Sequence, residues 1–177
     1  KVRGNITVAA TDNIIIVDNI TYVTNPGGTV PCNSPVRDML GLFSGNDVIV
    51  ADNLLNAQMP PTAVPGTYRS WANRTTSPYG YDEVIHGVIL ALSNFTVQNW
   101  SRNPTVGENC LLPSGVTEVA SRGCIRLMGG IIQYQRGPVG HSNGAGYSKI
   151  YDYDKCAGIM PPPYFPTTGR FSRGHFF

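Results

Sequence analysis

The stretch Ile131–Phe165, IIQYQRGPVGHSNGAGYSKIYDYDKCAGIMPPPYF, decides the fold that the sequence predicts. It begins as a short apolar strand that runs into Gly137-Pro138, passes through a Gly-rich turn and an alternating Tyr segment, and ends in three consecutive prolines. Proline has no backbone N–H and so cannot continue the hydrogen-bond ladder of a sheet. We therefore predict that residues 136–177 form a Pro/Tyr-rich cap on one end of a repetitive β-structure built by residues 1–135 of the same domain.

Four segments share a pattern of a short alternating strand, a polar corner and a second short strand. These segments are Ile6–Asn19, Leu40–Asn53, Val88–Asn99 and Ile125–Gln135, with the corner residues Asn13, Asn46, Asn94 and Gly130. Alternation places every second residue on one face of a strand, and Asn or Gly tolerates left-handed backbone at a corner. One repeat cannot bury its own apolar face, so neighbouring repeats must stack, and Asn side chains at matching corners can form a ladder. The pattern predicts an all-β chain folded as a right-handed parallel β-helix (a β-solenoid), with a β-sandwich as the alternative. Ile131–Gln135 is then the last coil, and the chain is expected to leave the stack at Arg136.

The corners are spaced more widely than the roughly 20 to 30 residues of a plain coil, which predicts long loop insertions. These fall at Thr24–Asp38, Asn56–Tyr81 and Asn103–Ser121. Long loops on a solenoid often carry binding. The second loop combines aromatic and Arg side chains, and we predict that it binds a partner through Tyr68, Arg69, Trp71, Arg74 and Tyr79.

Asn-x-Ser/Thr matches mark candidate glycosylation sites, and such matches arise easily in a chain rich in Asn and Thr. Asn73 is the best candidate because it lies in the Pro-rich second loop. The other matches are Asn5, Asn19, Asn94 and Asn99.

The composition favours strands and turns and gives no sign of a nucleic-acid partner. Lys is scarce, and Gly and Pro occur 20 and 14 times. Charged residues make up 14% of the chain, the net charge is +2, and the Arg residues are scattered. Without a clustered basic footprint, a nucleic-acid partner is disfavoured. No apolar run reaches the roughly 18 residues that a membrane span requires.

The four cysteines, Cys32, Cys110, Cys124 and Cys156, include no C-x-x-C pair. An even number of cysteines in a Lys-poor chain rich in Asn, Thr and Tyr favours disulfides and an oxidising compartment, hence a secreted or cell-surface protein. Four cysteines allow three pairings, and Cys110–Cys124 is attractive because it would join a loop to the next strand. Four free buried thiols are the alternative.

Acidic residues flank the corners of the first two coils at Asp12, Asp18, Asp47 and Asp52. Asp commonly ends strands and caps turns, and this is the interpretation that the pattern favours. Carboxylates on a parallel face can also serve a polysaccharide-active enzyme. No mixed set of acid, base and nucleophile accompanies them, so we predict no catalytic residue.

Metal and cofactor signals are weak. Asp152 and Asp154 alternate on one predicted strand and would give Ca²⁺ only two carboxylates, without a D-x-D-x-D-G loop. His86, His141 and His175 are isolated in the sequence. No metal ion and no cofactor are predicted.

Three motifs carry a resemblance to a known family: IQxxRGPVG (132–140), GYxKxYxYD (146–154) and PPYFP (162–166). The upstream pattern LGLxxxNDVIV (40–50) is similar to the same group. From about Asn5 to Thr168, the chain resembles bacterial pilus-associated, minor-pilin-like (PilX-type) cell-envelope proteins that carry a C-terminal β-solenoid domain of unknown function. The resemblance implies a surface-exposed, non-enzymatic β-solenoid, and it supplies no catalytic residues.

Three hypotheses for function follow. The first is a structural or adhesive module of a bacterial cell surface or extracellular filament, whose partners are envelope or filament subunits, glycans or further copies stacked end to end. The second is a polysaccharide-active enzyme that uses Asp47 and Asp52. The third is a DNA-contacting pilus-tip domain whose contacts would be Arg69, Arg74, Arg122, Arg126 and Arg136.

Overall fold

The computed structural model describes residues 1–24, 26, 31–51, 82–105, 108, 110–111, 117–118 and 121–166. Its regular structure consists of strands, and two of its three sheets are parallel. The larger sheet has the order β1-β3-β5-β9-β10, formed by Asn5–Ala10, Met39–Ser44, Glu83–Ala91, Cys124–Gln133 and Ser148–Tyr153. The smaller parallel sheet has the order β2-β4-β6, formed by Ile14–Ile16, Val48–Val50 and Phe95–Val97. The strands β7 (Cys110–Leu111) and β8 (Thr117–Glu118) pair antiparallel.

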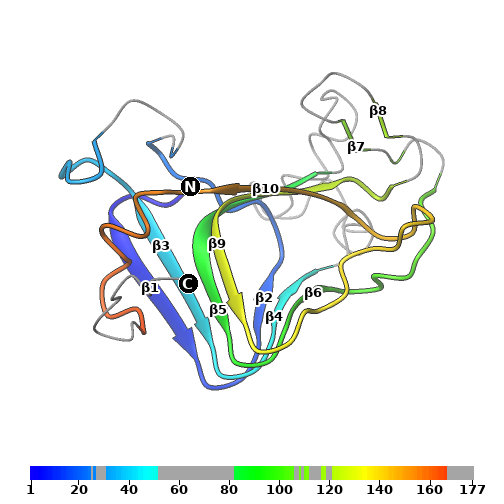
Figure 1. Cartoon of the computed structure of the whole chain (residues 1–177), viewed down its shortest axis with the longest axis horizontal. Coiled ribbons are helices and arrows are strands. Elements are labelled where there is room, and N and C mark those ends of the chain that lie inside the picture. The colour runs from blue at the N-terminus through cyan, green and yellow to red at the C-terminus, as the bar shows by residue number, and fades with distance from the viewer. Residues whose placement is uncertain are drawn as a thin grey trace, which may run out of the picture.

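Each of β1, β3 and β5 leads through a tight corner into β2, β4 and β6, and we call such a unit a rung. Figure 1 shows β1, β3, β5 and β9 running to a row of corners, from which β2, β4 and β6 turn back at an angle, whereas β10 lies across the top of the view. The register is the same in both sheets, because Ala10 pairs with Ser44 before the corner and Ile14 pairs with Val48 after it. The rungs therefore stack without slipping.

The corners are joined by a ladder of polar side chains. Asn13 Oδ1 accepts a hydrogen bond from the backbone N–H of Asp47 at 3.0 Å, and Asp47 Oδ1 accepts one from the backbone N–H of Asn94 at 2.8 Å. Gln133 Oε1 continues the ladder by accepting a hydrogen bond from Phe95 N–H at 2.8 Å. These bonds give protein partners to backbone N–H groups that would otherwise have none at the corner. The predicted stack of Asn side chains is replaced by side-chain-to-backbone bonds, and Asp47 rather than Asn46 occupies the middle position.

The core lies between the two sheets and is built by alternate residues. Val48 and Val50 of β4 are buried, as the alternation predicts, and they pack in one cluster with Ile85, Ile89 and other buried side chains of the larger sheet. Ile6 and Val8 of β1 pair with the buried Leu40 and Leu42 of β3, so they lie in inward-facing rows of the larger sheet. Their side chains are nevertheless 42% and 44% exposed. They are exposed because β1 is an edge strand of its sheet.

The all-β prediction is confirmed, and the parallel pairing differs from the antiparallel ladders of an immunoglobulin-like sandwich. Two details of the predicted fourth repeat are wrong. Gly130 lies inside β9, and the corner falls at Tyr134 and Gln135, whose N–H groups donate to Ala91 and Ser93. The chain also does not leave the stack at Arg136, since Thr96 Oγ1 of β6 donates to the carbonyl of Pro138 at 2.6 Å. A local pattern of alternation could not locate this corner because β9 is longer than the other strands of its sheet.

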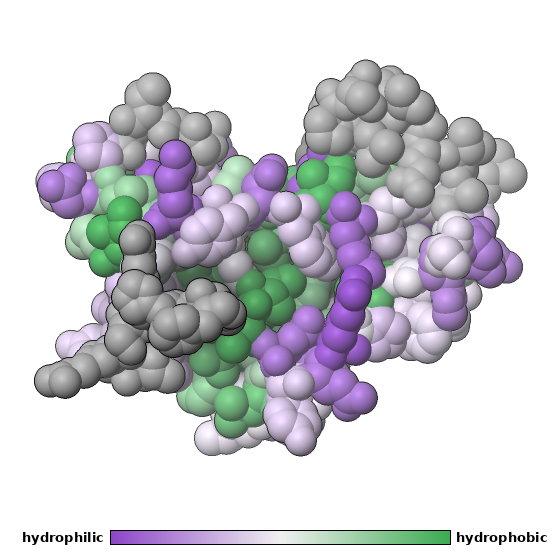
Figure 2. All heavy atoms as spheres, in the orientation of Figure 1, coloured by the Kyte–Doolittle hydropathy of each residue, from purple (hydrophilic) through white to green (hydrophobic). Residues whose placement is uncertain are grey.

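After β10 the chain crosses the outer face of the larger sheet, and we call residues 154–166 the strap. Phe165 and Pro162 lie over Gly41 of β3, where any Cβ would overlap them. Phe165 is buried in a second cluster with Met39 and Val88, and Thr7 Oγ1 of β1 donates to the strap. In the view of Figure 2, apolar side chains gather in the middle of the molecule, where Figure 1 draws β3, β5 and β9. The alternating Tyr segment forms β10, the last strand of the larger sheet, and Pro162 lies on the outer face of that sheet.

Candidate functional site: the clasp between the first rung and the strap

A disulfide joins the connection before β3 to the strap. Cys32 and Cys156 are bonded although 124 residues separate them in the sequence. Cys156 is buried against Met39 and Phe165 on the outer face of the sheet. The bond therefore ties the beginning of the stack to its end.

A buried ion pair lies beside this disulfide. One guanidinium nitrogen of Arg37 contacts both carboxylate oxygens of Asp154, at 2.8 and 3.0 Å, and both side chains are almost fully buried. The same nitrogen donates to the carbonyl of Pro26, and Asp154 Oδ1 also accepts from Cys156 N–H at 2.9 Å. A charge in a protein interior is tolerated only when it is paired and hydrogen-bonded, and each of these bonds helps to meet that requirement. We call the disulfide and the ion pair together the clasp.

The clasp lines a cavity of about 400 Å³. Its wall combines both cysteines of the disulfide, two prolines and Met128 with the charged residues of the clasp. Asp152, Tyr153 and Lys155 add exposed polar groups and an aromatic ring at its rim. Carboxylate, ammonium and phenol groups at this rim can bind a small polar ligand by hydrogen bonds and ring stacking.

The calcium interpretation is not supported by this geometry. Asp154 directs its carboxylate at the Arg37 guanidinium, which occupies the place a cation would take. Among the residues that the structure describes, no group of three or more His, Cys, Asp or Glu side chains could hold a metal ion.

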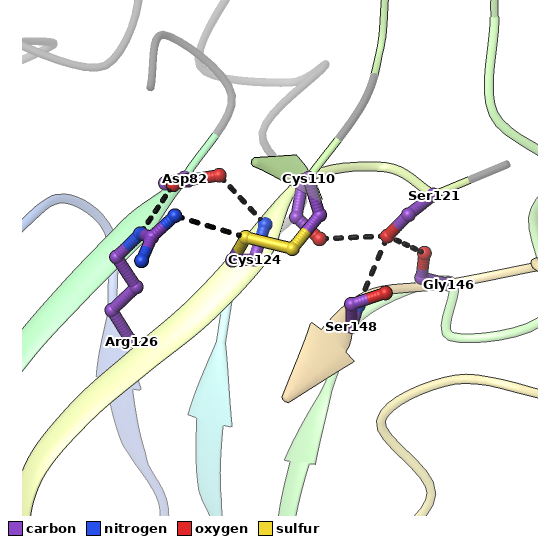
Figure 3. The surroundings of a disulfide bond; sticks show 8 residues. Asp82, Cys110, Ser121, Cys124, Arg126, Gly146 and Ser148 are labelled. Carbon is purple, nitrogen blue, oxygen red and sulfur yellow. Dashed lines mark hydrogen bonds and ion pairs between the residues drawn. A yellow bond between two sulfur atoms is a disulfide. The ribbon is translucent and has the colours of Figure 1, made fainter. Parts of the chain in front are cut away.

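The second disulfide, Cys110–Cys124, is the pair that the sequence favoured, and it is completely buried at the start of β9. Figure 3 shows Asp82 above it, with one carboxylate oxygen 2.7 Å from Cys124 N and the other 2.6 Å from Arg126 Nε. Burial raises the pKa of Asp82, and the bonds from Cys124 and Arg126 partly offset the rise. On the other side, Ser121 Oγ bonds the backbone of Gly123, Gly146 and Ser148. The surroundings hold the disulfide in place from several elements.

Two of the arginines proposed for DNA contacts serve the framework instead. Arg126 binds the Asp82 carboxylate, and Arg122 is completely buried. Arg122 Nη1 donates to the carbonyls of Gln98 and Asn99, and its guanidinium carbon lies 4.7 Å from the centre of the Tyr147 ring. A buried guanidinium cannot reach a phosphate, so the sequence-based assignment of Arg122 to DNA was wrong. Arg136 is exposed, whereas Arg69 and Arg74 lie outside the described residues.

The corner acids have structural partners. Asp47 belongs to the corner ladder, Asp12 Oδ1 accepts from the Asn46 amide at 3.3 Å, and Asp18 Oδ1 accepts from Asn19 N–H. Asp52 lies outside the described residues. The turn-capping interpretation accounts for the contacts of the three that are described.

Two of the three histidines have ring partners. His86 Nδ1 accepts from Tyr22 N–H at 3.1 Å, and burial lowers the pKa of its imidazole, so the neutral form that accepts this bond is favoured. His141 packs against Trp100, with ring centres 4.7 Å apart. His175 lies outside the described residues.

The predicted partner-binding loop lies outside the described residues. This holds for Tyr68, Arg69, Trp71, Arg74 and Tyr79, and for the glycosylation candidate Asn73. Of the other candidates, Asn19 Oδ1 accepts a hydrogen bond from Val84 N–H, and the Asn94 amide donates to Asp47 and Ser93. Both side chains hold rungs together.

Sequence reasoning missed Asp38 and Asp82 as rung connectors. Asp38 immediately precedes β3 and accepts from Gly4 N–H, while Asp82 immediately precedes β5 and accepts from Cys124 N–H. Each therefore bonds the neighbouring strand at the position that continues the sheet register. An Asp placed just before an apolar strand, twice in a chain with few charges, was the signal that could have revealed them.

Asp38 predicts an acid sensitivity. Burial alone would raise its pKa, but hydrogen bonds from Thr24 and Gly4 hold the pKa of Asp38 below its ordinary value of 3.8. A carboxyl group whose pKa is lower in the folded state stabilises the fold above the unfolded pKa and loses this effect as the pH falls through the folded pKa. We expect Asp38→Asn to cost about 1–3 kcal/mol at pH 7, and the difference from wild type to shrink as the pH falls below about 4.

Urea unfolding at pH 7, 5 and 3 with the disulfides intact measures this effect. Asp152→Asn, at an exposed carboxylate, is the matched control and should follow the wild-type profile. A constant stability difference between Asp38→Asn and wild type at all three pH values would contradict the assignment.

No family model matches the chain, and neither a curated protein nor a solved structure resembles it closely enough to count as a match. No helix in the described part of the chain is long and apolar enough to cross a membrane.

Proposed function

We propose that this chain is a short right-handed parallel β-helix that serves as a structural or adhesive module of a bacterial cell surface or extracellular filament. Successive rungs pair in parallel with one register across both sheets, which is how coils of a β-helix stack. Right-handed crossovers are the rule for parallel strands. The resemblance to PilX-type envelope proteins, carried by motifs from the end of β9 through β10 to the strap, points to the same setting.

The use of the buried charges is the observation that carries this proposal. Of the five buried carboxylates in the described residues, Asp38, Asp82, Glu108 and Asp154 each bind an arginine or a backbone N–H group of the framework, and Glu83 is the fifth. Buried polar groups at a catalytic site would be aimed at a substrate, whereas these are aimed at neighbouring strands and loops. Two disulfides add covalent ties that suit an oxidising, extracellular setting. The enzyme hypothesis loses support because Asp47 belongs to the corner ladder.

The partners of such a module are envelope or filament subunits, surface glycans or further copies of the chain. The loop around Trp71 is the proposed contact region, because its sequence combines aromatic and Arg side chains. Partner binding through that loop would leave the stacked rungs free to act as a rigid support.

A binding experiment on the disulfide-intact chain tests the proposal. The chain is applied to a glycan array and to purified envelope polysaccharide, and the same polysaccharide is assayed for release of reducing ends or unsaturated products. We expect saturable binding that Trp71→Ala with Arg74→Ala lowers at least tenfold, and no product above the buffer control. The matched control is the pair Tyr134→Ala and Ile132→Ala, at exposed positions of the stack.

Two outcomes would overturn the proposal. The first is cleavage that Asp47→Asn abolishes, which would establish the polysaccharide-active enzyme. The second is that the chain binds neither glycans nor envelope polysaccharide but binds DNA, with an affinity that falls steeply as salt is added. This result would favour the DNA-contacting domain.

A further inference from the structure

The Cys32–Cys156 disulfide divides the strands into two groups. The residues between the two cysteines hold every strand from β3 to β10, including the corners of the second and third rungs. Only β1 and β2 lie before Cys32, and only the end of the strap follows Cys156 in the described part of the chain. The bond thus closes one large covalent loop around most of the stack.

The two segments outside this loop lie close to each other. Thr7 of β1 donates to the strap at Pro163, and Phe165 packs over Gly41 of the neighbouring strand β3. Chain segments from opposite ends of the sequence therefore meet on the outer face of the larger sheet, on the same side as the disulfide. Tension between the two chain ends would enter the fold at these two places.

The covalent path between these places bypasses the stack. Tension that reaches Cys32 from the N-terminal side passes through the two sulfur atoms to Cys156 and leaves along the strap. Without the bond, it would pass from Cys156 to Asp154 and β10, which is an edge strand paired with β9 alone. Hydrogen bonds at such an edge can break one after another, so β10 would be an easy strand to peel.

We propose that the Cys32–Cys156 disulfide is a mechanical bypass that keeps tension applied at the two chain ends off the strands β3–β10. The buried Arg37–Asp154 pair lies inside the closed loop, with Arg37 five residues from Cys32 and Asp154 two residues from Cys156. It joins the two chain segments that flank the disulfide. Cys110–Cys124 also lies inside the loop and does not join the segments that carry the tension. The proposal goes beyond a structural or adhesive role and does not depend on the partner that such a role would need.

The bypass limits how far the chain can be extended. When force is applied at Lys1 and Phe177, the 31 residues before Cys32 and the 21 after Cys156 are the ones that it can straighten. At roughly 3.6 Å per residue, their contour length is about 190 Å, against about 590 Å for a chain that keeps only Cys110–Cys124. Loss of the bypass should therefore increase the extended length about threefold.

Single-molecule force spectroscopy on the full oxidised chain, held by handles at both ends, measures this length. We expect the wild type to extend by about 190 Å and the double variant Cys32→Ser/Cys156→Ser by about three times as much, at a rupture force that reports release of β10. Cys110→Ser/Cys124→Ser is the matched control, because it removes a disulfide inside the loop and should leave the wild-type extension unchanged.

A wild-type extension close to the full chain length would overturn the proposal, as would equal extensions for the wild type and Cys32→Ser/Cys156→Ser. If the double variant does not fold, the same comparison can be made on the wild type before and after its disulfides are reduced. Adding a reductant to a tethered wild-type molecule must then lengthen its extension about threefold, and an unchanged length would refute the bypass.

Discussion

A Gly129→Ala variant is expected to lose about 3 kcal/mol or more of its free energy of unfolding, or to fail to fold. Gly129 lies in β9 directly opposite Gly87 of β5, and a Cβ at this position would overlap the Gly87 carbonyl group. The overlapped atoms are backbone atoms of a central ladder, so relief requires the two strands to separate. The φ angle of 155° at Gly129 adds a conformation that side chains rarely adopt. Urea unfolding followed by circular dichroism, with the disulfides intact, gives the loss.

The neighbouring glycine supplies the control. A Cβ on Gly130 would meet no atom within 4 Å, so Gly130→Ala should stay within about 1 kcal/mol of wild type. Both substitutions add one methyl group to consecutive residues of one strand. Similar losses for the two variants would show that the close approach of β5 and β9 at Gly129 is not a feature of the folded protein.

An Asp154→Ala variant should lose about 3–5 kcal/mol, because it leaves the Arg37 guanidinium buried without its carboxylate partner. The hydrogen bond from Cys156 N–H to Asp154 Oδ1 is lost at the same time. The cost comes chiefly from the stranded charge, so it should fall when the charge is removed as well. The double variant Arg37→Met/Asp154→Leu is therefore expected to recover most of the loss, since a buried pair can be replaced by apolar residues of similar volume.

Asp152→Ala is the matched control for this series. Asp152 lines the same cavity two residues earlier but is exposed, and its replacement should change the stability by no more than about 0.5 kcal/mol. Equilibrium unfolding of the oxidised proteins at pH 7 measures all three variants. If the double variant were as unstable as Asp154→Ala, the loss would stem from packing at Asp154 and the ion-pair argument would fail.

The clasp and the corner ladder hold the stack in different ways. The ladder from Asn13 through Asp47 to Asn94 fixes each rung against the next by short-range contacts along one row of corners. The clasp connects positions that are 124 residues apart and anchors the strap, which crosses the outer face of the larger sheet. Failure of one corner would loosen neighbouring rungs, whereas loss of the clasp would free the strap.

Much of the local structure could be predicted from the sequence. Alternating apolar residues identified the strands near Val48, Val88 and Ile125, because a strand that is buried on one face must repeat every second residue. Cys110–Cys124 was an attractive pairing in the sequence because it would join a loop to the next strand, and this disulfide is present. The same local signal misplaced the fourth corner at Gly130, because a glycine within a long strand resembles a glycine at a turn.

The charged contacts could not be predicted in the same way. Arg37 and Asp154 are 117 residues apart, and nothing within a few residues of either one marks the other as its partner. Arg122 resembled a surface cation in the sequence but is buried beneath the Tyr147 ring, because the chain after β9 returns over it. Such pairings depend on which strands become neighbours, and many arrangements of the same strands would satisfy the local pattern equally well.

The sequence by itself determined that the chain forms short strands, where most corners fall and which residues face inward, since these properties depend on neighbours within a few positions. The tertiary structure alone decided that Phe165 and the prolines lie on a sheet face over Gly41, and that Cys32 meets Cys156 beside a buried ion pair. The physical reason is the range of the interactions. Alternation and turn chemistry act between adjacent residues, whereas the path of the strap is set by the outer face that the stacked strands create only after they have assembled.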